Sequence, residues 1–256
     1  MRALSILIMI VLVSVTVNAQ TNSAQNLSRH QQAIIRIGAV TAKGDLAKLK
    51  TELNAGLDSG LTVNQIKEAI VHLYAYCGFP RSIRGLQTFM AVLEERKAKG
   101  INDIIGSEAS PIKGERSKYE RGKTILGELT GVSQDGPKKG YSAFAPEIDV
   151  FLKEHLFSDI FERDVLTYNE REMVTISVLA SIGGVEPMLQ SHLNICLNVG
   201  LSPSQLQEFV GVIKSTIGVE EATTAQKVLD EVLKNLGFRL MMVSATLSMT
   251  MPNFTV

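Results

Sequence analysis

Two stretches of this chain, 140 residues apart, align with each other without a gap. Residues 44–78 read GDLAKLKTELNAGLDSGLTVNQIKEAIVHLYAYCG, and residues 184–218 read GVEPMLQSHLNICLNVGLSPSQLQEFVGVIKSTIG. Ten of the thirty-five positions are identical: Gly44/Gly184, Leu49/Leu189, Leu53/Leu193, Asn54/Asn194, Leu57/Leu197, Gly60/Gly200, Leu61/Leu201, Gln65/Gln205, Glu68/Glu208 and Gly78/Gly218. Self-similarity at a fixed spacing is the signature of a repeated structural unit. We therefore predict a tandem duplication.

An amphipathic helix is the first element that the repeat predicts. Leu189, Leu193 and Leu197 recur at every fourth residue, which places the three side chains on one face of a helix. Gly200 follows this face, and glycine is common just past a helix C-terminus. We therefore expect the helix to end there.

The next helix in each repeat has a matching start signal. Thr62-x-x-Gln65 and Ser202-x-x-Gln205 are capping boxes, in which the hydroxyl accepts from a backbone N–H and the glutamine reaches back. No segment of either repeat alternates apolar and polar residues with the period of two that a strand requires. The predicted fold class is all-α, with tandem duplicated helical repeats.

The first nineteen residues have the layout of a secretory signal peptide. Arg2 precedes an apolar run from Ala3 to Val17, and small residues lead to a cleavage site after Ala19. The alternative is an uncleaved membrane anchor, but this run of 15 residues is shorter than the roughly 20 that span a bilayer. We expect an exported protein, periplasmic or secreted, with no stable membrane insertion after cleavage.

Composition and loop signals divide the remaining chain. We predict repeat 1 over residues 27–100, a linker with a short helix over 101–146, repeat 2 over 147–236, and a tail over 237–256. The tail is apolar and rich in β-branched residues, and either an edge strand or an extended arm across a neighbouring subunit fits it. The formal net charge is zero, so nothing indicates a nucleic-acid partner.

The two repeats differ at polar positions. The alignment pairs Arg171 with Gln31, Glu172 with Gln32, and His192 with Glu52. A duplicated enzyme that kept one site and let the other decay would show this pattern. The alternative is that three surface positions drifted apart without any consequence for function.

At these residues the sequence resembles the carboxymuconolactone decarboxylase family, within the alkylhydroperoxidase D-like superfamily. The resemblance rests on YNEREMVTISVLASIGGVEPMLQSHLNICLNVGLSPSQLQEFV in repeat 2 and on GLTVNQIKEAIVHLYAYCGFPRSI in repeat 1, and covers roughly residues 27–236. It implies an all-helical fold, a homotrimer, and a small carboxylate or lactone as substrate. It also carries the family's Arg-Glu pair onto Arg171 and Glu172 and its motif histidine onto His192.

Decarboxylation of a conjugated lactone acid needs few protein groups and no cofactor. We expect Arg171 to hold a carboxylate, His192 to act as acid or base, and Glu172 to orient the imidazole. The alternative is that Arg171 and Glu172 serve a helix N-terminus or an ion pair and that His192 is a half-buried structural residue. Further candidates for substrate binding are Tyr76, Cys77 and Arg81, in the segment YAYCGFPR.

Two alternatives to the lyase stay open at this point. Peroxiredoxin or alkylhydroperoxidase activity is disfavoured, because the Cys-x-x-Cys that this branch uses is absent from Val185–Met188. Cys77 and Cys196 are the only thiols, and they either form a disulfide or serve as small buried hydrophobes. The other alternative is a non-catalytic, ligand-binding oligomer. No motif for a metal or a nucleotide cofactor occurs.

Overall fold

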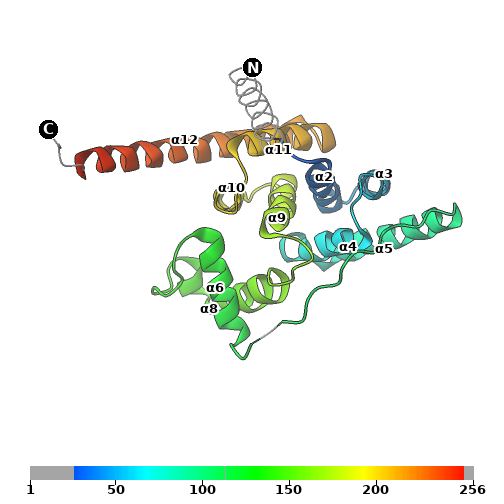
Figure 1. Ribbon diagram of the computed structural model, residues 1–256, viewed down its shortest axis with the longest axis horizontal. Coiled ribbons are helices and arrows are strands. Elements are labelled where there is room, and N and C mark those ends of the chain that lie inside the picture. Colours follow the sequence, from blue (N-terminus) through cyan, green and yellow to red (C-terminus); the bar gives the residue numbers. More distant parts are fainter. Residues whose placement is uncertain (1–25, 113, 251–256) are drawn as a thin grey trace, which may run out of the picture.

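The computed structural model describes residues 26–112 and 114–250, with side chains as far as Phe238. Within these ranges the chain consists of helices and loops, which confirms the all-α prediction. The predicted signal peptide lies outside the described residues. The elements are α2 (Arg29–Lys43), α3 (Leu46–Asp58), α4 (Val63–His72), α5 (Tyr74–Ala98), α6 (Lys118–Thr130), α7 (Tyr141–Phe144), α8 (Pro146–Phe151), the π-helix η1 (Leu152–Ile160), α9 (Tyr168–Ile182), α10 (Glu186–Asn198), α11 (Pro203–Thr216) and α12 (Val219–Thr250) (Figure 1).

Helix boundaries in the two halves follow the spacing of the sequence alignment. The helix α10 begins 140 residues after α3, and α11 begins 140 residues after α4. The duplication itself stays a prediction.

Capping boxes fix the start of the second helix in each half. The backbone N–H groups of Gln65 and Gln205 donate to the hydroxyls of Thr62 and Ser202, both at 3.2 Å. The glutamine side chains accept from the backbone N–H of Thr62 at 3.0 Å and of Ser202 at 2.9 Å. Both caps were predicted, and each satisfies donors that the first turn of a helix leaves free.

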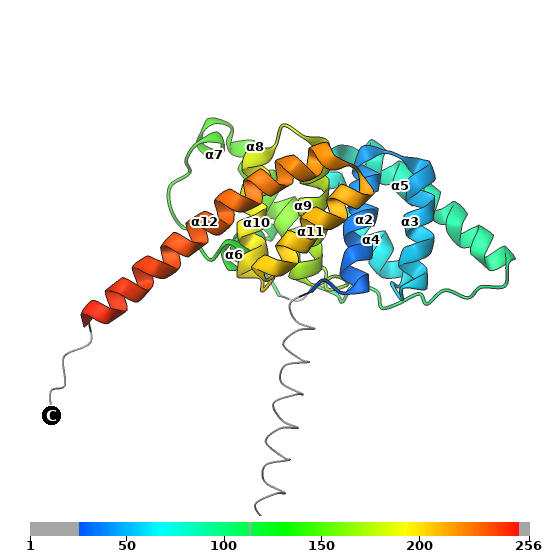
Figure 2. The ribbon, with the colours of Figure 1, turned by 90° about the horizontal axis from the view of Figure 1, so that it is seen from above.

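The helices α2 and α9 pack closely in the centre of the molecule (Figure 2). A Cβ atom added to Gly38 on α2 would lie 3.3 Å from Cβ of Ser177 on α9, so glycine permits this close approach. The predicted leucine stripe of α10 faces this core, with Leu189 and Leu193 buried and Leu197 half-buried. Gly200 follows the end of α10 with a positive φ of 96°, as predicted for a residue that terminates a helix.

The region predicted as a linker does more than connect the halves. Residues 104–108 contact the start of α4, where Val63 N–H donates to Ile104 O at 2.9 Å and Asn64 N–H donates to Ile105 O at 2.8 Å. The predicted short helix is α6, and it packs against η1 around a separate small core that includes Ile125, Leu129, Phe157 and Ile160. We call residues 118–160 the α6–η1 unit.

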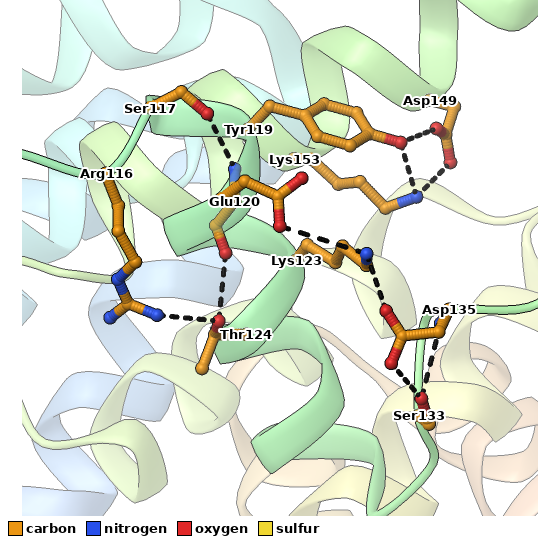
Figure 3. A network of polar contacts seen from close by, with 10 residues as sticks. All are labelled: Arg116, Ser117, Tyr119, Glu120, Lys123, Thr124, Ser133, Asp135, Asp149 and Lys153. Atoms are coloured by element: carbon orange, nitrogen blue, oxygen red, sulfur yellow. Dashed lines mark hydrogen bonds and ion pairs between the residues drawn. The ribbon is translucent and has the colours of Figure 1, made fainter.

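A buried polar network reinforces the α6–η1 unit (Figure 3). The ammonium group of Lys153 donates to Oδ1 of Asp149 at 2.7 Å, and the hydroxyl of Tyr119 donates to Oδ2 at 3.0 Å. Lys138 adds a second ion pair to Asp149 at 3.0 Å. Because Asp149 is mostly buried, these donors offset the cost of removing its carboxylate from water.

The alternative of an edge strand in the tail was wrong as far as the structure describes it, whereas an arm across a neighbouring subunit stays a prediction. Residues 237–250 continue α12, which extends beyond the body of the molecule in both views (Figures 1 and 2). A helix that has already formed propagates at little cost, and the leucine, methionine and alanine residues of this segment are good helix formers. Between residues 26 and 250, none of the described helices combines the length and the apolar character that crossing a membrane requires.

Candidate active site

The first turns of α9 bring two predicted residues into the core. A capping box of Thr167 and Glu170 sets where the helix begins, and Arg171 and Glu172 follow directly. Both side chains are fully buried at 0% exposure. Successive residues on a helix point about 100° apart, so the two side chains meet different neighbours.

Glu172 points toward α10 and contacts His192. Its Oε2 lies 2.8 Å from Nδ1 of His192, whose side chain is 13% exposed. A carboxylate only accepts hydrogen bonds, so Nδ1 carries the proton in this contact. The other ring nitrogen, Nε2, is then free to take up or deliver a proton. The predicted pair of Glu172 and His192 is therefore in contact.

Arg171 points toward α4 and pairs with a carboxylate of the protein itself. Its Nη2 donates to Oε1 of Glu68 at 2.6 Å and to the carbonyl of Arg163 at 2.5 Å. Arg163 also binds Glu68 through Nε and Nη2 at 2.9 and 3.0 Å. Burial alone would raise the pKa of Glu68, but the hydrogen bonds from Arg163 and Arg171 lower it below its ordinary value. In this arrangement Arg171 presents no exposed atom to a substrate carboxylate.

His72 completes the polar cluster around Arg171. Its Nε2 lies 2.9 Å from the hydroxyl of Thr175, which donates to the carbonyl of Arg171 at 3.1 Å. The Thr175 oxygen must therefore accept, so Nε2 of His72 carries the proton and Nδ1 accepts from Nη1 of Arg171 at 3.4 Å. Burial, with the positive charges of Arg171 and His192, holds the pKa of His72 well below its ordinary value.

Tyr76 lies between the two histidines. Its ring centroid is 5.5 Å from that of His72 and 5.7 Å from that of His192, and the contact with His192 is edge-to-face. Burial and the nearby charge of Glu172 raise the pKa of the Tyr76 hydroxyl far above its ordinary value. The side chain of Thr175 lies near this hydroxyl and partly opposes the rise in its pKa, but no hydrogen bond of acceptable geometry joins the two groups, and the buried Tyr76 oxygen has no partner in the described part of the chain.

Tyr76 also borders a surface hollow of about 530 Å³. The lining consists of Ala42, Lys43, Tyr76, Cys77, Arg81, Ser181 and Ile182. The hollow therefore brings together all three predicted substrate-binding residues, whereas His192 and Glu172 do not line it. The exposed guanidinium of Arg81 lies against Gly44, where any side chain would collide with it.

The two cysteines are free thiols in this structure. Burial raises the pKa of Cys77 to about 11, although the charge of Arg81 opposes this, and the thiol donates to the carbonyl of Leu73 at 3.3 Å. Cys196 is completely buried, and burial raises its pKa well above the ordinary value. Thiolates are the reactive form of cysteine, so neither environment favours peroxide chemistry.

Glu68 belongs to this site but was not predicted as a site residue. The available signal was its identity with Glu208, one of the ten matched positions of the alignment. Glu208 likewise binds the opposite half of the chain, because it accepts from the backbone N–H of Leu27 at 2.7 Å and from Nε2 of Gln32 at 3.0 Å. Each carboxylate thus stabilises the start of a helix in the other half.

Comparison with known proteins matches a segment that contains part of the site. Residues 146–231 match the model of the Carboxymuconolactone decarboxylase family. The chain is also similar to the 4-carboxymuconolactone decarboxylase of Acinetobacter baylyi, with 25% identity over 124 residues that make up 48% of this chain and 92% of the relative. The segment matched by the family model contains Arg171, Glu172 and His192, whereas Glu68 and Tyr76 precede it.

Proposed function

We propose that this protein, whose residues 146–231 match the model of the carboxymuconolactone decarboxylase family, removes CO2 from a small lactone that carries a carboxylate. The observation that carries this proposal is the contact of 2.8 Å between Nδ1 of His192 and Oε2 of Glu172. An imidazole held by a buried carboxylate is an oriented group for proton transfer, which this reaction requires.

The substrate itself accepts the electrons. When the carboxylate-bearing carbon is conjugated through a double bond to the lactone carbonyl, the pair from the breaking C–C bond moves onto the carbonyl oxygen. CO2 leaves and an enolate remains. The imidazolium form of His192 then donates the Nε2 proton to carbon, and water restores that proton afterwards. Glu172 stabilises the imidazolium and keeps Nδ1 protonated throughout.

Arg81 replaces Arg171 as the group that holds the substrate carboxylate. Arg171 is buried and paired with Glu68, so a substrate would have to break an ion pair of 2.6 Å to reach it. Arg81 is exposed at the hollow, and no ion pair of its side chain is found in the described part of the chain. A guanidinium binds a carboxylate through two parallel hydrogen bonds, which orients the substrate as well as attracting it.

The test is CO2 release from 4-carboxymuconolactone by the purified protein. His192→Ala should lower the rate by a factor of about 10² or more, the usual contribution of a general acid or base. Glu52→Ala is the matched control, because Glu52 occupies the position of His192 in the other half of the alignment, and it should leave the rate unchanged. Equal losses in the two variants, or no CO2 release by the wild type, would contradict the proposal.

A further inference from the structure

Unpaired buried polar atoms gather at the proposed site. Four buried side-chain atoms in the described part of the chain have no hydrogen-bond partner: Asn64 Oδ1, Tyr76 Oη, Arg171 Nε and Glu172 Oε1. Asn64 lies apart, beneath the segment 101–112, where its Nδ2 donates to Gly106 O at 3.0 Å. The other three belong to neighbouring residues of the candidate active site, since the charges of Arg171 and Glu172 both act on the Tyr76 hydroxyl.

Such atoms weaken a protein unless something else binds them. A buried donor or acceptor without a partner costs about 1–3 kcal/mol. Tyr76 could avoid this cost if it were phenylalanine, because its ring contacts with His72 and His192 do not use the hydroxyl. The hydroxyl is therefore of no use to the folded protein alone, which indicates that a ligand supplies its partner.

The position of Tyr76 suits a group that meets a ligand. Tyr76 lines the hollow that contains Arg81, and its ring contacts the imidazole of His192. A molecule held at Arg81 therefore meets Tyr76 on its way to His192. Turning the tyrosine side chain to admit it breaks no hydrogen bond, because the hydroxyl has none to lose.

We infer that the Tyr76 hydroxyl is a catalytic hydrogen-bond donor to the lactone carbonyl oxygen of the substrate, the atom on which negative charge develops as CO2 leaves. This inference rests on the proposed decarboxylation. The hydroxyl stays protonated at physiological pH because its pKa is raised, so it can donate throughout the reaction. A donor directed at developing charge contributes more to the transition state than to the ground state.

Proton and charge balance with this donor in place. The C–C bond to the carboxylate breaks, CO2 departs, and the electron pair forms an enolate whose oxygen accepts from Tyr76. His192 protonates carbon, and the electron pair returns from oxygen to the ring. Tyr76 keeps its own proton, so it stabilises the intermediate without taking part in proton transfer.

Tyr76→Phe tests the inference, with Tyr74→Phe as the matched control. Tyr74 is two residues away, and its ring stacks on Phe79 at 4.5 Å instead of contacting His192. The probe is 4-nitrophenolate, a flat anion with its charge on oxygen that imitates the enolate, titrated by absorbance. Tyr76→Phe should weaken probe binding by about tenfold or more and lower kcat by about 10²-fold. Tyr74→Phe should change either value less than about twofold, because it removes no donor from the site.

The unfolding midpoint separates this role from a structural one. Removing an unpaired buried hydroxyl should leave the midpoint of Tyr76→Phe unchanged or raised. If the variant does not fold, NMR of wild-type protein labelled at the tyrosine ring carbon tests whether the probe meets Tyr76. One of the five tyrosine signals should then shift when the probe is added.

The outcomes distinguish the two proposals. Probe binding within twofold of wild type in Tyr76→Phe, or no probe binding by wild type, overturns the inference. Wild-type protein that binds the probe through Tyr76 but releases no CO2 from the lactone acid overturns the proposed function and leaves the Tyr76 donor supported.

Discussion

Nδ1 of His192 donates to Oε2 of Glu172 over 2.8 Å, and this is the one hydrogen bond found for either side chain in the described part of the chain. Glu172 is completely buried, and the imidazole is the one hydrogen-bond donor found for its carboxylate in the described part of the chain. This hydrogen bond offsets part of the free-energy cost of removing the carboxylate from water. The same contact therefore serves both stability and proton transfer. These two roles depend on different ring nitrogens, and substitutions can separate them.

His192→Asn should abolish activity while changing the free energy of unfolding by less than about 1 kcal/mol, the size of one ordinary hydrogen bond. The amide nitrogen of asparagine can occupy the place of Nδ1 and still donate to Glu172, but asparagine has no counterpart of Nε2. His192→Ala removes both nitrogens and should cost about 1–3 kcal/mol, because it leaves a buried carboxylate unpaired. Denaturant midpoints, with slopes compared for two-state behaviour, measure the difference. A loss above about 2 kcal/mol in His192→Asn would favour a structural role for the histidine.

Glu68→Gln should destabilise the protein by about 3 kcal/mol or more, because it leaves the buried guanidinium of Arg171 without a counter-charge. Glu95→Gln is a control in which the ion pair has the same distance. Glu95 pairs with Lys50 at 2.6 Å, the same distance as Glu68 to Arg171, but both side chains of that pair are exposed. Exposed pairs contribute little to stability, so this variant should unfold like the wild type. Equal losses of unfolding free energy in the two variants would show that burial does not determine how much the Glu68 ion pair contributes to stability.

Stability should fall as the pH drops below 6.5, the ordinary pKa of histidine, and His72 should account for part of the fall. The pKa of His72 is lowered by burial and by the charges of Arg171 and His192, so the folded state holds the neutral ring while the unfolded state takes up a proton. The contribution is complete above pH 6.5 and is lost as the pH falls. His72→Gln should flatten the dependence of unfolding free energy on pH between about pH 6.5 and 5. An unchanged slope would mean that His72 is charged in the folded protein.

A second pH effect should appear in stronger acid. Burial would raise the pKa of Asp149, but hydrogen bonds from Lys153, Lys138 and Tyr119 lower it from 3.8 to about 2. Its contribution is therefore present above pH 3.8 and is lost as the pH falls toward 2. Asp149→Asn should remove this part of the acid dependence, as followed by thermal unfolding over that range. Identical profiles for the variant and the wild type would exclude the Asp149 network as the cause.

Local patterns predicted the helices, because their signals lie within a few residues. The capping boxes at Thr62 and Ser202 and the leucine stripe of α10 each depend only on neighbours in sequence. The tail was misjudged for the same reason, since β-branched residues express a weak preference that an existing helix overrides. The fold class needed no information about distant contacts.

The partners within the site could not be predicted in this way. Glu68 and Arg171 are 103 residues apart, and nothing local shows that the arginine pairs with a carboxylate of the protein instead of a substrate. Glu172 and His192 were selected because they differ between the repeats, and their contact follows from the packing of α9 on α10. Tyr76 was predicted as a substrate-binding residue only through the family resemblance. That its hydroxyl has no partner follows from the structure and not from the sequence.

The segment that matches the family model, residues 146–231, is not sufficient to make the site. Glu68 fixes Arg171 from α4, and Tyr76 covers His192 from the start of α5, both about a hundred residues earlier in the chain. The segment that matches the family model is therefore shorter than the part of the chain that forms the site, which also includes Glu68 and Tyr76. Fragments cut at the limits of the recognisable segment would keep the signature residues and lose the surroundings that give those residues their chemistry. The family match lies within the second half of this molecule, whereas the proposed catalysis would need residues of both halves.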